Sequence, residues 1–222
     1  MTARRNPRLR QILATGWAPD AAPADGPSGE EAKTHPMRAV TRQIAFEPDG
    51  WTPERAAKVT ELFNGLAPEW NQRVGTGRLN AVADALDRGA VPGGGRCLEL
   101  GSGTGFASGL LAERFAVVAA VDLSMEMLRR APTGPAPRLL ADGSRLPFRD
   151  HSVDVAVLVN MFLFRQELER VLSPAGVVVW VSSIGDRTPI YLSADDLLEA
   201  LGPAWHGVAS SCGEATWCVA RR

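Results

Sequence analysis

The sequence has few of the residues that mark several common classes of protein. Its three cysteines, Cys97, Cys212 and Cys218, form no CxxC pair and have no metal-ligand spacing with the three histidines, so neither a disulfide scaffold nor a metal site is predicted. No apolar run approaches the roughly 18 residues that a membrane span needs. The N-terminus also lacks the apolar segment of a signal peptide. We therefore expect a cytoplasmic protein that holds no metal and contacts no membrane.

An excess of charge of either sign is also missing. The 24 basic and 25 acidic residues leave a net charge of −1, which gives no general electrostatic reason to expect a nucleic acid or a membrane surface as partner. Only Lys33 and Lys58 are lysines, a bias that we attribute to genome composition rather than to phosphate recognition. With 45% hydrophobic and 22% charged residues, the composition is that of a globular protein with a real core.

Composition divides the chain into three parts. Residues 1–50 are rich in Pro, Ala, Gly and Asp without periodicity, which predicts a mobile or loosely packed arm. Residues 51–92 contain two helical patterns, the first opened by Thr52 and Pro53, which are favourable cap and first-turn residues. We predict a helical pre-core or lid region there, and a ligand-binding core over residues 93–222.

In the core, strand patterns alternate with helical ones. The predicted parallel strands are Arg96–Leu100, Ala116–Val121, Arg138–Ala141, Val153–Val159 and Gly176–Ser182. Alternation of this kind predicts a parallel sheet with right-handed crossovers. Two β-rich runs joined by Cys212-Gly213-Glu214 predict a closing antiparallel hairpin. The predicted class is therefore α/β, with a Rossmann-like, doubly wound, mostly parallel sheet that ends in a hairpin.

A glycine-rich turn, ELGSGTG, follows the first of these strands at residues 99–105. Glycine at every second position lets the main chain turn tightly and approach a ligand closely. A phosphate-binding P-loop would need Lys followed by Ser or Thr after the last glycine, and the dinucleotide fingerprint would need glycine where Phe106 stands. The carboxylate of Glu99 would also repel a pyrophosphate. The turn therefore predicts a ligand without phosphates.

Acidic residues end the next two strands. The Asp122 carboxylate is placed to accept hydrogen bonds from the 2′ and 3′ hydroxyls of a ribose. Asp142 is placed to accept one from an adenine amino group, with the main chain of Gly143 or Ser144 meeting a ring nitrogen. Because open α/β sheets bind ligands at the carboxyl ends of their strands, these residues together predict a site for adenosine.

Four segments in order resemble the class I S-adenosylmethionine-dependent methyltransferases. They are LELGSGTG, VVAAVDLSMEML, LLADGSRLPFRDHSVDVAVLVN and ERVLSPAGVVVWVSS, which cover residues 96–183. The resemblance implies the family's seven-stranded fold and S-adenosyl-L-methionine as cofactor. The segment LFNGLAPEWN is similar to the menaquinone/ubiquinone-type enzymes of small molecules. Asn64 and Trp70 stand where that group usually has Asp and Tyr, so its quinone substrate is not transferred.

The resemblance also implies which residues bind the cofactor. They are Glu99, Gly101, Ser102, Gly103, Gly105, Asp122, Leu123, Asp142, Gly143 and Asn160. Within this set the glycine turn would pass the methionine part, and Asn160 would lie beneath the sulfonium. Leu123 and Met125 would flank the adenine. Arg73, between lid and core, is either a partner of the cofactor carboxylate or a solvated side chain.

The expected reaction is in-line transfer of a methyl group to a small-molecule acceptor. Because the cofactor supplies a reactive donor, the protein's task is mainly positioning and desolvation. Asp186 and Tyr191, after the fifth strand, are the candidates for a general base. The run NMFLF after the fourth strand lacks the Asn/Asp-Pro-Pro-aromatic motif of enzymes that methylate base amino groups. It suits either the lining of an apolar pocket or the packing of a short helix.

Two alternatives stay open. An RNA or protein methyltransferase would use the Arg-rich start of the arm, with Arg4, Arg5, Arg8 and Arg10. A non-catalytic module would bind S-adenosylmethionine or its demethylated product without turnover. The sequence predicts neither the oligomeric state nor the atom that is methylated.

Overall fold

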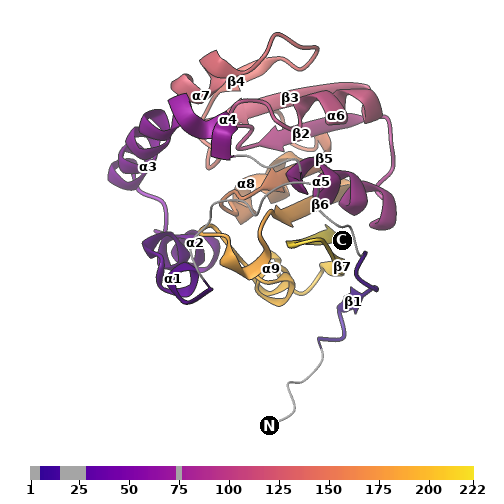
Figure 1. Ribbon diagram of the computed structural model, residues 1–222. Coiled ribbons are helices and arrows are strands. Elements are labelled where there is room, and N and C mark those ends of the chain that lie inside the picture. The colour runs from indigo at the N-terminus through magenta and orange to yellow at the C-terminus, as the bar shows by residue number, and fades with distance from the viewer. Residues whose placement is uncertain (1–5, 16–28, 74–76) are drawn as a thin grey trace.

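The computed structural model describes residues 6–15, 29–73 and 77–222. Their strands form an eight-stranded sheet in the order β1-β7-β8-β6-β5-β2-β3-β4 (Figure 1). The strands are β1 (Leu9–Gln11), β2 (Arg96–Leu100), β3 (Val117–Asp122), β4 (Arg138–Leu140), β5 (Val153–Val159), β6 (Leu172–Ser182), β7 (His206–Cys212) and β8 (Ala215–Arg221). The sheet thus runs from the N-terminal strand at one edge to β4 at the other.

The pairing confirms the predicted α/β class. β2 lies between β3 and β5, β4 pairs with β3, and β6 pairs with β5, all in parallel. β8 runs antiparallel between β6 and β7. The hairpin closes at Gly213, whose φ of 58° is of the left-handed kind that glycine adopts freely.

The eighth strand comes from the segment that the sequence predicted as a loose arm. Leu9–Gln11 pairs in parallel with residues 207–209 of β7, and the Arg8 guanidinium donates to the carbonyl oxygens of Leu198 at 3.2 Å and Gly202 at 2.6 Å. Three residues that pair through their backbone leave no periodic apolar pattern, so local composition did not reveal them. Residues 1–5 and 16–28 of the arm lie outside the described residues.

The described helices are α1 (Gly29–Thr34), α2 (Pro36–Phe46), α3 (Pro53–Leu66), α4 (Trp70–Arg73), α5 (Gly77–Arg88), α6 (Ser108–Arg114), α7 (Met125–Arg130), α8 (Arg165–Val171) and α9 (Ala194–Leu201), with 3-10 turns η1 (Ala67–Glu69) and η2 (Gly185–Arg187). Four of them, α2, α3, α7 and α9, begin at a side-chain cap. The Thr52 side chain accepts from the backbone N–H of Arg55 at the start of α3. Ser193 and Asp196 form a capping box on α9, which fixes its first turn.

The two faces of the sheet pack on different helices. Leu86 of α5 and Leu111 of α6 join one core cluster, whereas Leu168 of α8 and Leu198 of α9 join the other, together with parts of α2 and α3. Figure 1 shows α3 beside α7, outside the sheet. Within the described residues, none of the helices is long and apolar enough to span a bilayer. The carboxyl ends of β2, β3 and β5 are left free to form a site.

Candidate functional site

The turn after β2 is built from three glycines in the left-handed region. Gly101, Gly103 and Gly105 have φ values of 74°, 55° and 75°, which other residues adopt only with strain. A Cβ on Gly101 would lie 2.5 Å from the sulfur of Met161, and one on Gly103 would lie 3.2 Å from the indole nitrogen of Trp70. Both backbone geometry and close neighbours therefore require glycine at the first two positions.

Asp122, the last residue of β3, ties this turn to the next loop. One carboxylate oxygen accepts from the backbone N–H of Gly103 at 2.7 Å, and the other accepts from that of Ser124 at 2.8 Å. Burial raises the pKa of Asp122, and these backbone donors act in the opposite direction. The carboxylate is thus held in a fixed orientation, and each oxygen keeps a lone pair for a further donor.

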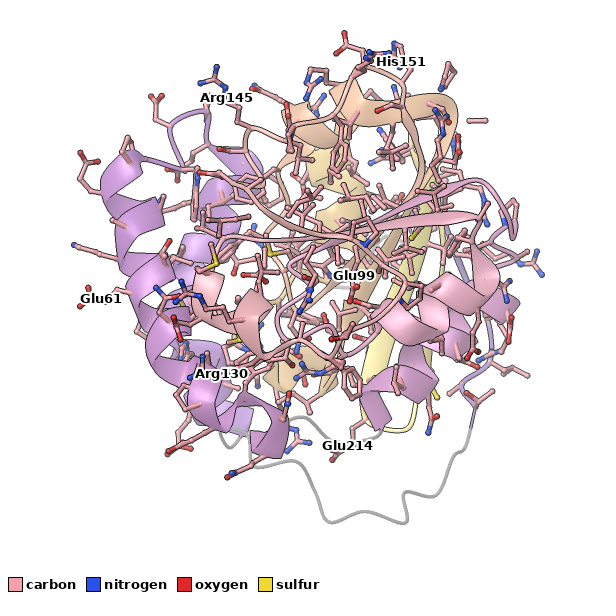
Figure 2. The ribbon with its side chains drawn as sticks, turned by 90° about the horizontal axis from the view of Figure 1, so that it is seen from above. Glu61, Glu99, Arg130, Arg145, His151 and Glu214 are labelled. Atoms are coloured by element: carbon pink, nitrogen blue, oxygen red, sulfur yellow. The ribbon has the colours of Figure 1, made fainter. Side chains whose placement is uncertain are left out.

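Glu99 lies near the centre of the view from above, whereas Glu61, Arg145 and His151 lie at its edges (Figure 2). Its side chain is 4% exposed and accepts from the hydroxyl of Ser108. Burial raises the pKa of Glu99 to about 7, against the hydrogen bonds from Ser108 and the Ala107 backbone, and the negative charge of Asp122 adds to the rise. This carboxyl group supports the start of α6 from inside the fold.

Asp142, in the loop after β4, binds an aromatic side chain of the pre-core region. Its two oxygens lie 3.0 and 2.9 Å from the indole N–H of Trp51, and one of them also accepts from the backbone of Ser144 at 2.8 Å. Trp51 in turn packs against Phe162 and Phe164, with ring centroids 5.8 and 5.2 Å away. In this structure, therefore, the carboxylate expected at an adenine amino group holds the lid.

Two further side-chain hydrogen bonds connect the pre-core region to the core. Asn64 of α3 accepts from the hydroxyl of Ser124 at 2.6 Å, and Asn71 of α4 accepts from that of Thr104 at 2.6 Å. Together with the Trp51 contact, these bonds join residues 51–73 to the loops after β2, β3 and β4. The pre-core region is thus fastened over the carboxyl ends of three neighbouring strands.

A cavity of about 880 Å³, including the space open at its mouth, lies between these elements. All but two of the predicted cofactor residues line it: Glu99, Gly101, Ser102, Gly103, Asp122, Leu123, Gly143 and Asn160. Gly105 and Asp142 are not on its wall, and Met127 of α7 lines it in place of Met125, which is 38% exposed.

Asn160 lines the cavity from the end of β5 in a left-handed conformation, with φ of 51°. Its amide donates to the hydroxyl of Ser183 at 2.8 Å and accepts from the Ser183 backbone at 2.9 Å. These two bonds fix the side-chain amide against the end of β6. The residues that follow, Met161, Phe162 and Phe164, also line the cavity, so this apolar run serves as a pocket wall.

The two candidates for a general base lie outside the cavity wall. Asp186 belongs to η2, and the Tyr191 ring lies under the Arg38 guanidinium at 4.6 Å from its centroid. His151 is exposed at the periphery (Figure 2). No cluster of metal-ligating side chains occurs among the residues that the structure describes.

Sequence reasoning did not single out Arg78, which lines the cavity from the first turn of α5. Its Nε is buried and has no hydrogen-bond partner in the described part of the chain. No glycine turn or strand-end position marks Arg78 in the sequence, and only its three-dimensional surroundings identify it as part of the site. Arg73, the arginine that was considered for a cofactor carboxylate, has a side chain outside the described residues.

Comparison with known proteins shows similarity to methyltransferases. Residues 98–180 match the family model described as methyltransferase domain. The chain is 38% identical over 90 residues to a demethylmenaquinone methyltransferase of Corynebacterium urealyticum, covering 37% of this chain and 39% of that protein. It is 36% identical over 148 residues to the biotin biosynthesis bifunctional protein BioHC of Cellvibrio japonicus, covering 62% of this chain and 27% of that protein.

Both matches cover well under two thirds of the relatives' own lengths. Among solved structures, the complex of DhpI with SAH superposes with a TM-score of 0.62 at 22% identity, over 75% of this chain and 96% of that one. At this identity the superposition shows a shared fold. The fold, the glycine turn and the family match thus agree on one class of domain.

Proposed function

We propose that this chain, whose residues 98–180 match a methyltransferase domain, is a class I enzyme that transfers the methyl group of S-adenosylmethionine to a small, largely apolar acceptor. The observation that carries the proposal is the joint placement of the glycine turn and Asp122, bonded to each other at 2.7 Å on the wall of one cavity. The named relatives include methyltransferases of small molecules, which supports this acceptor class.

The residues of the cavity fit the cofactor. The hydroxyl oxygen of Ser102 is buried on its wall and has no hydrogen-bond partner among the described residues. A polar atom left in this state costs free energy unless a ligand satisfies it. Asp122 retains lone pairs for two hydroxyl groups, and the glycine turn leaves room for close approach. We therefore assign the ribose to Asp122 and the amino-acid part to the side of Ser102 and Gly103.

Each group then has a physical task. When bound, the cofactor supplies a methyl group on a positively charged sulfur, which is a reactive electrophile. The Asp122 carboxylate, held by two backbone N–H groups, orients the nucleoside. Glu99 and Ser108 hold the turn in place from behind. The enclosing aromatic side chains exclude water, which strengthens the electrostatic interactions inside the cavity.

The aromatic part of the cavity wall suggests the character of the acceptor. Trp51, Phe63, Trp70, Phe162 and Phe164 line the cavity, and they offer ring faces and few hydrogen-bond donors. Among the described residues on the wall, the titratable side chains are those of Arg78, Glu99 and Asp122. Since none of these is a free base, the site suits an acceptor whose attacking atom is already nucleophilic, such as a stabilised carbanion or a thiolate.

Calorimetric titration tests the cofactor assignment. We expect S-adenosylmethionine and S-adenosylhomocysteine to bind with micromolar affinity and NADH, the control, to show no binding. Incubation with methyl-labelled cofactor and separate pools of apolar small molecules, RNA and protein then tests the acceptor. Label in the small-molecule pool alone supports the proposal, whereas label in RNA or protein contradicts it. Binding without transfer to any pool would favour the non-catalytic module.

A further inference from the structure

Arg78 is a cation in the cavity wall that lacks an anionic partner in the described part of the chain. It lines the cavity from α5 (Gly77–Arg88), and its Nε is buried without a hydrogen bond. Burial lowers the pKa of Arg78 to about 10, and no neighbouring carboxylate counteracts the effect. The two carboxylates of the described cavity wall form hydrogen bonds to other groups, Asp122 to the Gly103 backbone and Glu99 to Ser108.

A charge in such a position is costly. Removing a guanidinium from water without pairing it is unfavourable, and natural proteins rarely keep one buried unless something compensates. Two rings give partial compensation, since the guanidinium carbon lies 5.9 Å from the Trp70 centroid and 6.0 Å from that of Phe106. Cation–π contacts of this kind stabilise the positive charge, but they leave the buried Nε–H without a hydrogen bond among the described residues. The arrangement therefore points to an anionic ligand.

The position of Arg78 identifies which part of a ligand it meets. Trp70 lies against Gly103, since a Cβ on that glycine would be 3.2 Å from the indole nitrogen. The guanidinium beside Trp70 and Phe106 is therefore next to the glycine turn, where the amino-acid part of the cofactor was assigned. The cavity thus carries a carboxylate at Asp122 for hydroxyl groups and a guanidinium at Arg78 for an anion.

We propose that Arg78 binds the α-carboxylate of the cofactor's amino-acid part through its guanidinium N–H groups. The inference rests on the proposed function, because it takes S-adenosylmethionine as the ligand. A planar guanidinium matches a carboxylate with two parallel hydrogen bonds, which a lysine ammonium does not reproduce. The proposed partner is thus Arg78, in the first turn of α5, rather than Arg73, which was considered from the sequence.

Calorimetry with two ligands tests this assignment. S-adenosylhomocysteine carries the carboxylate, whereas 5′-methylthioadenosine has the same nucleoside and a thioether sulfur but no amino-acid part. We expect Arg78→Gln to weaken S-adenosylhomocysteine binding by about 30- to 100-fold, as for loss of a charge-assisted contact, and to change 5′-methylthioadenosine binding by less than about threefold. Arg78→Lys should weaken S-adenosylhomocysteine binding by an intermediate factor and leave 5′-methylthioadenosine binding unchanged. Arg145→Gln, at an exposed position (Figure 2), is the matched control and should change neither.

The outcomes separate the inference from the function on which it rests. Equal weakening of both ligands would mean that Arg78 only supports the fold, and an unchanged S-adenosylhomocysteine affinity would mean that it binds no carboxylate there. Either result overturns the inference. Absence of binding to the wild-type protein would instead overturn the cofactor assignment. If Arg78→Gln does not fold, Arg78→Lys decides, because it keeps the charge and loses only the paired hydrogen bonds.

Discussion

At the scale of single residues, Glu99 couples the stability of the protein to pH. Its pKa in the folded protein, about 7, is raised above the ordinary value of 4.5 by burial. Between these values the folded state holds a proton that the unfolded state has lost. Stability associated with this group is therefore fully present below about pH 4.5 and is lost as the pH rises through about 7.

We expect Glu99→Gln to remove this dependence, because an amide does not titrate. Urea unfolding at a series of pH values should show the wild-type unfolding free energy falling by on the order of 3 kcal/mol relative to the variant between about pH 4.5 and pH 8. Glu61→Gln, on an exposed position of α3 (Figure 2), is the control and should keep the wild-type profile. Parallel curves for the wild type and Glu99→Gln would contradict the assignment.

Asp122 is the residue on which the nucleoside assignment depends. Asp122→Asn keeps an oxygen for one backbone N–H but loses the charge, so we expect S-adenosylhomocysteine to bind about 30- to 100-fold more weakly. Isothermal titration measures the change directly. The control is Asp150→Asn, whose side chain is 68% exposed in an ion pair with Arg170. A loss of less than about threefold, with the fold intact, would refute a ribose contact at Asp122.

At the scale of elements, the linker between α2 and α3 is fastened to the core by Trp51. Its indole N–H donates to the Asp142 carboxylate, and its rings pack on Phe162 and Phe164. Trp51→Phe keeps most of the packing and loses the hydrogen bonds to a charged acceptor. We expect a loss of about 1–3 kcal/mol of local stability, seen as faster hydrogen exchange in residues 47–60.

A tryptophan without such a bond provides the comparison. The Nε1 of Trp205 is buried without a partner among the described residues, so Trp205→Phe removes an indole N–H but no hydrogen bond. It should leave exchange in residues 47–60 unchanged, whatever it costs elsewhere in the core. Equal acceleration there in both variants would indicate that packing, rather than the bond to Asp142, holds the linker.

The edge strand β1 is the second element with a separable role. Deleting residues 1–15 uncovers the backbone of β7, with which Leu9–Gln11 pairs, and an open edge strand promotes association. We expect a lower melting temperature and concentration-dependent light scattering, with S-adenosylhomocysteine affinity unchanged because no residue of β1 lines the cavity. Deleting residues 1–5 alone, which keeps β1, should have neither effect. A fall in affinity on removing 1–15 would instead assign the arm to ligand binding.

At the scale of the whole molecule, the sequence predicted the features that depend on neighbouring residues and missed those that depend on residues far apart in the chain. β2 and β5 form at their predicted residues because continuous apolar runs mark strands buried on both faces. The glycine turn and Asp122 were predicted because their backbone and charge requirements act at fixed positions after strands. β1 and the contact between Trp51 and Asp142 were missed, since each joins residues far apart in the chain through a single pairing.

The same long-range contacts predict how a ligand affects the whole protein. Residues 51–73 are joined to three strand ends by Trp51, Asn64 and Asn71, and Trp51, Phe63 and Trp70 of this region line the cavity. A ligand that fills the cavity therefore contacts both the sheet edge and the region fastened over it. A ligand that binds only to this closed arrangement stabilises the folded state. The stabilisation is strongest for the parts of the protein that open most easily.

We expect S-adenosylhomocysteine at about 100 times its dissociation constant to add roughly 2.7 kcal/mol, a rise in melting temperature of about 5–10 °C for a chain of this size. Hydrogen exchange should slow most in α3, η1 and α4, and least in β7 and α9, which lie away from the cavity wall. Asp122→Asn at the same ligand concentration should show a smaller rise in melting temperature, because a smaller fraction of the protein has ligand bound. A thermal shift without added protection in residues 51–73 would mean that this region closes independently of the ligand and acts only as a fixed wall of the cavity.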